Sequence, residues 1–211
     1  QSYATTGEVV ALAREAAVRG GFYDSHIRDE SSYSIGLSAA IEEALAIGRA
    51  AQIPVNISHI KALGVDVQGQ APQIIAKVEA AQRQGQRVTA DQYPWSASGT
   101  TLVAALVPQW AQDGGRDAMI RRFDNPADLA RIRAEAYLTP ALAELIMISD
   151  APHQPEIVGR RLSELATRWG LDPIDAAICI LRRDDIDIVV FVMKEPDIVR
   201  AMGRPWVMSS S

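Results

Sequence analysis

Two of the three histidines in the 211-residue chain stand at the ends of predicted strands. His26 closes the stretch 22–26, where strand alternation places it on one face with Phe22 and Asp24. His59 closes the stretch 55–59, where alternation places it on one face with Val55 and Ile57. In a parallel α/β fold the carboxyl ends of strands meet at one edge, where side chains from successive strands can reach a shared ligand. Histidine is the commonest metal ligand in proteins. The pair therefore predicts a metal site, although a structural role for each histidine stays open.

The third histidine, His153, lies between two prolines and is predicted to be an exposed loop residue. Other polar residues follow the same strand ends. Lys61 comes two residues after His59, and Asp91 and Tyr93 end a third predicted strand. A cation, a hydroxyl donor and a carboxylate would suit an anionic or carbonyl-bearing ligand. Each also has a plain structural alternative, namely a loop cap for Asp91, packing for Tyr93 and a solvated side chain for Lys61.

The first half of the chain alternates helices with strands. Apolar residues at helical spacing predict helices over 7–19, 37–52 and 72–84, and alternating residues predict strands over 22–26, 55–59 and 87–93. The connections are too short for anything but parallel crossovers, so the fold class is α/β.

The second half is less regular. It is predicted to contain a small-residue loop at 96–101, strands over 145–149, 186–193 and 205–209, and helices over 116–122, 124–136, 159–169, 173–181 and 195–202.

Charge and composition exclude several classes of protein. The chain has 21 Lys and Arg against 26 Asp and Glu, a net charge of −5, which argues against a nucleic-acid partner. Neither a long apolar run nor a secretory signal is present, so we expect no membrane partner. The single cysteine, Cys179, excludes an internal disulfide framework, fits a cytoplasmic location and is predicted to lie in the core.

The ends of the chain are predicted to be internal to a longer protein. It begins with Gln1 rather than Met and stops directly after the strand predicted at 205–209. An open piece of an α/β fold would expose strand edges and apolar surface, so we expect the isolated chain to associate with itself.

Three motifs together resemble the D-aminoacylase (N-acyl-D-amino-acid deacylase) family of the amidohydrolase superfamily. They are SHIRDE at 25–30, PVNISHIK at 54–61 and DQYPWSASGT at 91–100, and VGRRLSELA at 158–166 and EPD at 195–197 agree. The resemblance implies a partial (β/α)8 TIM barrel, with residues 1–211 supplying about strands four to eight of the catalytic barrel. It further implies zinc-dependent hydrolysis of the amide bond of N-acyl-D-amino acids, small molecules that would be the protein's partners.

The same resemblance implies roles for individual residues. His26 and His59 fall on the two imidazole ligands of zinc, and Lys61 and Tyr93 on positions that bind the carboxylate and carbonyl region of the substrate. Ser98 and Gly99 fall in the substrate-contacting loop. Some members of the family carry a serine at the position of Gly99.

Other parts of the family's site are expected outside the chain. The general-base aspartate is expected just after Ser211, so no catalytic residue is assigned within the chain. A His-x-His motif and a cysteine ligand are expected before Gln1.

The sequence leaves two alternative functions open. The first is a catalytically silent barrel piece, or pseudoenzyme, that binds a small acid or a partner without turnover. The second is a related cyclic-amide amidohydrolase, such as a dihydroorotase or hydantoinase, which would bridge two metals through a carboxylated lysine. It is ranked lower because His26 stands where that lysine would be expected.

Overall fold

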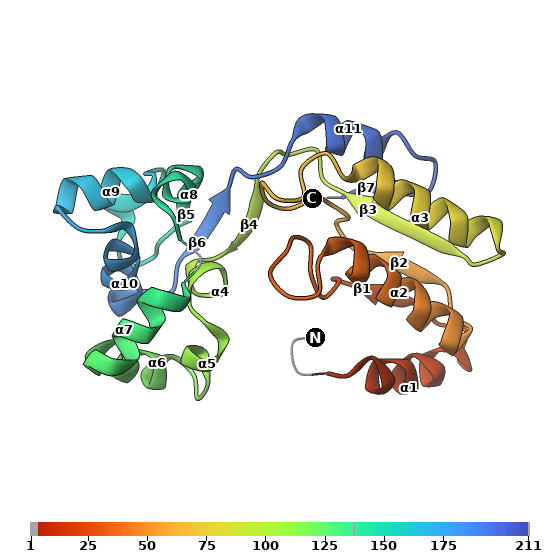
Figure 1. Ribbon diagram of the computed structural model, residues 1–211, viewed down its shortest axis with the longest axis horizontal. Coiled ribbons are helices and arrows are strands. Elements are labelled where there is room, and N and C mark those ends of the chain that lie inside the picture. Colours follow the sequence, from red (N-terminus) through yellow and green to blue (C-terminus); the bar gives the residue numbers. More distant parts are fainter. Residues whose placement is uncertain (1–3, 137, 211) are drawn as a thin grey trace. The chain divides into compact units, whose positions relative to one another are not determined.

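The computed structural model describes residues 4–136 and 138–210, which form two compact units (Figure 1). The first unit comprises the chain up to Ser96 together with the segment from Val192 onward. The second unit is Ala97–Phe191.

The first unit is built on a four-stranded sheet in the order β1-β2-β3-β7. Its strands are β1 (Tyr23–Ser25), β2 (Val55–Ile57), β3 (Val88–Gln92) and β7 (Val207–Ser209), and each neighbouring pair is parallel. This arrangement confirms the α/β fold and the parallel crossovers predicted from the short connections.

Four helices cover this sheet, and they agree with the predicted ranges to within a few residues. The helices are α1 (Thr6–Ala17), α2 (Leu37–Ala51), α3 (Ala71–Arg83) and α11 (Glu195–Met202). Each packs against the one before it, and α11 packs against α3 although the second unit separates them along the chain. The side chain of Thr5 accepts a hydrogen bond from the Glu8 backbone and so caps the start of α1. Ile41 of α2, Ile57 of β2 and Val78 of α3 are fully buried between helices and sheet.

The opposite face of the sheet is polar. The register pairs Asp24 with Asn56, and Asn56 with Thr89. The Asn56 amide donates to Asp24 Oδ1 (2.9 Å) and its oxygen accepts from Thr89 Oγ1 (2.9 Å). Parallel strands are usually apolar on both faces. A row of hydrogen-bonded polar side chains on one face therefore marks the side of the sheet that is available for chemistry.

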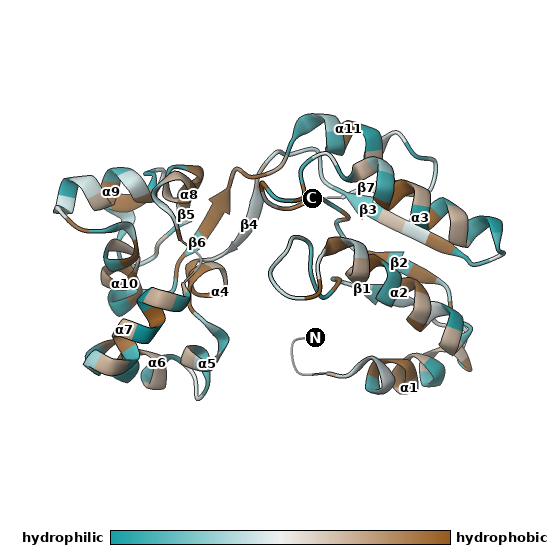
Figure 2. Ribbon diagram, in the orientation of Figure 1, coloured by the Kyte–Doolittle hydropathy of each residue, from teal (hydrophilic) through white to brown (hydrophobic). Residues whose placement is uncertain are grey.

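The second unit is built on a three-stranded antiparallel sheet in the order β4-β6-β5. Its strands are β4 (Ser98–Thr101), β5 (Ile146–Asp150) and β6 (Asp187–Val190). The colouring in Figure 2 shows that β6 is apolar, and Ile188 at its centre is fully buried. Around the sheet lie α4 (Leu102–Leu106), α5 (Gln109–Gln112), α6 (Arg116–Asp124), α7 (Pro126–Glu135), α8 (Pro140–Leu145), the 3-10 turn Pro155–Ile157, α9 (Leu162–Trp169) and α10 (Pro173–Arg183).

Three sequence expectations are corrected here. The loop predicted at 96–101 contains strand β4, because pairing with β6 overrides the weak strand preference of serine and glycine. The apolar strands predicted at 145–149 and 186–193 exist, but they form their own antiparallel sheet instead of joining the parallel one, since an apolar run predicts burial and not the partner. Cys179 is exposed, because the buried face of α10 is formed by its neighbours Ile178 and Ile180.

Among the described residues, we find no helix with the length and apolarity needed to cross a membrane.

Candidate metal centre

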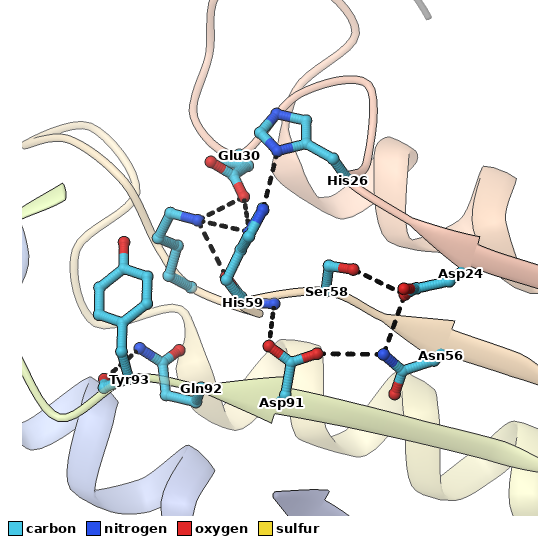
Figure 3. A network of polar contacts seen from close by, with 10 residues as sticks. Asp24, His26, Glu30, Asn56, Ser58, His59, Asp91, Gln92 and Tyr93 are labelled. Carbon is cyan, nitrogen blue, oxygen red and sulfur yellow. Dashed lines mark hydrogen bonds and ion pairs between the residues drawn. The ribbon is translucent and has the colours of Figure 1, made fainter. Parts of the chain in front are cut away.

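His26 and His59 meet at the carboxyl ends of β1 and β2 (Figure 3). His26 Nδ1 lies 3.0 Å from His59 Nε2, and the rings stand edge to face with centroids 4.7 Å apart. Two nitrogens that bind one tetrahedral zinc at 2.0–2.1 Å lie roughly 3.3 Å apart. The observed separation is close to that value, so the pair fits the predicted metal.

His59 reaches this position through an unusual backbone conformation. Strand alternation would place it on the helix-covered side with Ile57, whereas His26 follows the polar face of Asp24. However, β2 ends at Ile57, and His59 has a φ of 38°, in the left-handed region that non-glycine residues rarely adopt. The alternation argument from sequence was therefore wrong for His59, and the turn after β2 is what brings the two rings together.

Asp91 holds this turn. Its Oδ1 accepts from the His59 backbone N–H (2.9 Å), its main-chain oxygen accepts from Ile60 N–H (2.8 Å), and Oδ2 accepts from the Asn56 amide (3.0 Å). Burial raises the pKa of Asp91, but the hydrogen bonds from His59, Asn56 and Ser210 outweigh it, so the pKa lies below its usual value. The carboxylate faces backbone and amide donors, which corrects its predicted place in a substrate cradle.

Glu30 is a further residue of the site, and its role was missed from the sequence. It is buried, and its Oε1 lies 2.9 Å from His59 Nδ1 and 2.5 Å from Lys61 Nζ. Burial raises the pKa of Glu30, but the contacts with His59 and Lys61 lower it to below its usual value. His59 Nδ1 also lies 2.8 Å from Lys61 Nζ. We assign the Nδ1 proton to the bond with Glu30, because an ionised carboxylate can only accept, and this leaves the Nε2 lone pair for a metal.

The protonation of the other groups agrees with metal binding. Burial is the main cause that lowers the pKa of His26, so its imidazole is neutral near pH 7, the form that ligates a metal. Burial also lowers the pKa of Lys61, and the charge of Glu30 partly offsets this effect. Lys61 Nζ donates to Glu30 and to the carbonyl oxygen of His59 (2.9 Å).

A second acidic residue fixes the loop that carries Glu30. The two oxygens of Asp29 accept from the backbone N–H groups of Ser31, Ser34 and Gly36 at 2.6–2.9 Å. The burial of Asp29 raises its pKa, but these bonds outweigh that effect and the pKa is lowered. The loop between β1 and α2 is thereby held by an ionised carboxylate.

The remaining predicted residues lie in both units. The Tyr93 ring lies near the buried Lys61, whose Nζ is 5.5 Å from the ring centroid. Ser98 and Gly99 belong to β4 in the second unit, opposite Val190 and Val189. His153 also lies in the second unit, with 78% of its side chain exposed and its Nδ1 3.0 Å from Asp184, which confirms the prediction of an exposed residue.

One group of candidate ligands is found among the described residues. His26, Glu30 and His59 place one donor atom each within 4.8 Å of one another. Since Glu30 already bonds to Lys61 and His59, we assign it as the partner of His59 and not as a ligand. The general base predicted after Ser211 lies outside the described residues.

The first unit carries its paired histidines at the carboxyl edge of a parallel sheet, and the structures that the whole chain resembles are of the amidohydrolase type, which confirms the partial barrel expected from the motifs. The chain is homologous over nearly its whole length to D-aminoacylases and N-acyl-D-glutamate deacylases, which confirms the resemblance in its motifs. No family model matches the chain.

The relatives cover nearly all of the chain but extend well beyond it. A D-aminoacylase of Alcaligenes xylosoxydans xylosoxydans is 29% identical over 200 residues, which are 95% of this chain and 33% of the relative. An N-acyl-D-glutamate deacylase of the same organism is 28% identical over 208 residues, 99% of the chain and 35% of the relative. The chain thus spans about a third of the length of the curated relatives it matches.

Solved structures show the same fold. The N-acyl-D-glutamate deacylase from Bordetella bronchiseptica, complexed with zinc and a phosphonate mimic of the tetrahedral intermediate, matches with a TM-score of 0.73, at 28% identity over 98% of this chain and 35% of that structure. A D-aminoacylase described as defining a novel subset of amidohydrolases matches with a TM-score of 0.70, at 28% identity over 99% and 35%. Another D-aminoacylase structure concerns a binuclear metal centre with one-metal activation.

Proposed function

We propose that this chain contributes two zinc ligands to an enzyme that hydrolyses N-acyl-D-amino acids to a carboxylate and a free D-amino acid. The observation that carries the proposal is the contact of His26 Nδ1 with His59 Nε2 in a chain homologous to deacylases of that substrate class. The single cysteine supports a cytoplasmic location for this enzyme.

The ligand nitrogens are His26 Nδ1 and His59 Nε2. When bound, zinc supplies a nucleophilic water and polarises the carbonyl of the scissile amide. Glu30 keeps His59 in the tautomer that binds through Nε2, and the turn at His59 aims that nitrogen at His26. The site is thus organised by contacts within the chain.

Lys61 and Tyr93 are the proposed substrate-binding residues. Glu30 and the His59 carbonyl accept two of the N–H groups of Lys61, and its Nζ also lies 2.8 Å from His59 Nδ1. The positive charge of the Lys61 ammonium group is proposed to attract the substrate carboxylate. The Tyr93 hydroxyl is proposed to donate to the scissile carbonyl oxygen as charge develops on it. Ser98 and Gly99 are proposed to contact the substrate from β4.

The leaving amine needs a proton, and therefore a carboxylate that can carry one. Glu30 and Asp91 are both engaged by hydrogen bonds within the chain. We therefore retain the aspartate expected just after Ser211 as the proposed acid–base residue.

The test is hydrolysis by the complete gene product of matched N-acetyl-D- and N-acetyl-L-amino acids with methionine, glutamate or aspartate side chains. We expect zinc to copurify and the D-substrates alone to be cleaved, with one side-chain class preferred. A folded protein that binds no zinc and cleaves none of them would reject the proposal in favour of a silent barrel. Cleavage of dihydroorotate or a hydantoin instead would indicate a cyclic-amide hydrolase.

A further inference from the structure

The left-handed turn at His59 depends on groups at the end of the neighbouring strand β3. His59 is one of two non-glycine residues with positive φ among the described residues. Such a conformation costs on the order of 1 kcal/mol or more and persists only where surrounding contacts enforce it. The contacts that enforce it come from Asp91, which binds the N–H groups of both His59 and Ile60.

The Asp91 carboxylate is itself held in place. Asn56 donates to its Oδ2, and the same Asn56 nitrogen donates to Asp24 Oδ1, so that one amide bridges carboxylates from β1 and β3 (Figure 3). Ser58 also donates to Asp24 Oδ1 (2.6 Å) from the residue just before His59. These hydrogen bonds on the polar face of the sheet therefore hold the Asp91 carboxylate in place beside the turn.

We propose that Asp91 is a positioning residue for the metal site, acting on His59 through its backbone and not through its imidazole. The Oδ1 hydrogen bond stabilises the left-handed conformation, and that conformation carries His59 Nε2 across to His26. Glu30 acts on the ring of the same histidine, at Nδ1, so two carboxylates control its position and its tautomer separately. This proposal rests on the proposed function for the identity of the metal, but the backbone effect does not need a metal.

The variant to test is Asp91→Ala in the complete gene product, compared with Asp91→Asn and Thr89→Ala. Asparagine keeps an acceptor for the His59 N–H, but its amide nitrogen replaces the oxygen that accepts from Asn56. Thr89 is a matched control because it lies on the same strand and polar face but bonds to Asn56. Should Asp91→Ala fail to fold, Asp91→Ser serves in its place, because its hydroxyl is one bond short of the position of Oδ1.

The first readout is the crystal structure of the metal-free variants. We expect His59 in Asp91→Ala to leave the left-handed region and its Nε2 to move away from His26 Nδ1, while Asp91→Asn and Thr89→Ala keep the 3.0 Å contact. An unchanged His59 in Asp91→Ala would overturn the proposal, whether or not the protein binds zinc.

The second readout is zinc affinity, measured by competition with a chelator. Loss of an outer residue that orients a ligand typically weakens metal binding about 10- to 100-fold. We expect that loss for Asp91→Ala, a smaller loss for Asp91→Asn, which lacks the acceptor for Asn56, and near-native affinity for Thr89→Ala. Equal affinities in all four proteins would contradict the proposal. A wild-type protein without zinc would instead reject the proposed function and leave the structural readout to decide this one.

Discussion

Replacing either His26 or His59 by alanine is expected to abolish both zinc binding and hydrolysis. Each imidazole supplies one ligand atom, and the two nitrogens are 3.0 Å apart. Removing a ligand weakens metal binding more than removing a residue that only orients a ligand, so we expect zinc affinity to fall by more than about 100-fold. Metal content after dialysis and turnover of an N-acetyl-D-amino acid measure the two effects.

The third histidine provides the matched control. His153 has the same chemistry, but it lies in the second unit, and its exposed ring pairs with Asp184. His153→Ala should keep zinc and activity. If His153→Ala lost zinc as completely as His26→Ala, or if His59→Ala retained it, the assignment of the ligand pair would be wrong.

Breaking the buried pair of Glu30 and Lys61 is expected to destabilise the fold strongly. Only 8% of the Glu30 side chain and 3% of the Lys61 side chain are exposed, and their charged atoms are 2.5 Å apart. Removing one partner of a buried pair leaves a charge without compensation and typically costs about 3–5 kcal/mol. Glu30→Gln should therefore lower the free energy of unfolding by that order, as measured by urea denaturation.

A double variant separates this cost from other effects. Glu30→Gln combined with Lys61→Met removes both charges, so it should be more stable than Glu30→Gln alone. Arg49→Met is a control, because Arg49 forms an ion pair with Glu42 in which both side chains are more than 40% exposed. Exposed pairs contribute about 0–1 kcal/mol. If Glu30→Gln lowered the free energy of unfolding by no more than Arg49→Met does, the assignment of a buried ion pair would be wrong.

Much of the first unit could be predicted from the sequence, because its elements are regular. Helical spacing and strand alternation gave α2, α3 and β3 almost to the residue, and short connections required parallel strands. The ends of those strands also indicated His26 and His59 as a pair. The motifs indicated the relatives that the comparisons confirmed.

The rest of the site could not be predicted, because it depends on tertiary contacts. Strand alternation gives no sign that the chain turns at His59, since glycine is the residue that usually marks a left-handed turn and none stands at 55–61. Glu30 meets Lys61 across a separation of 31 residues, in a loop with no periodicity. Asp91 was identified as a polar residue at a strand end, but only the folded structure shows that its carboxylate faces the backbone of His59.

The second unit shows a different limit of sequence reasoning. The apolar run ending at 193 predicts a buried strand, but burial is equally compatible with a parallel or an antiparallel neighbour. Ser98–Thr101 pairs with that strand although its residues favour a loop, because the sheet supplies the hydrogen bonds. The partner of a strand is set by the whole fold and not by its own residues.

Anomalous scattering at the zinc absorption edge, measured on crystals of the complete gene product, tests most directly whether His26 and His59 bind the same zinc ion. We expect a strong peak about 2.0–2.1 Å from both His26 Nδ1 and His59 Nε2, with Glu30 on the far side of the His59 ring. A zinc peak only elsewhere, or zinc bound through His59 Nδ1, would contradict this expectation.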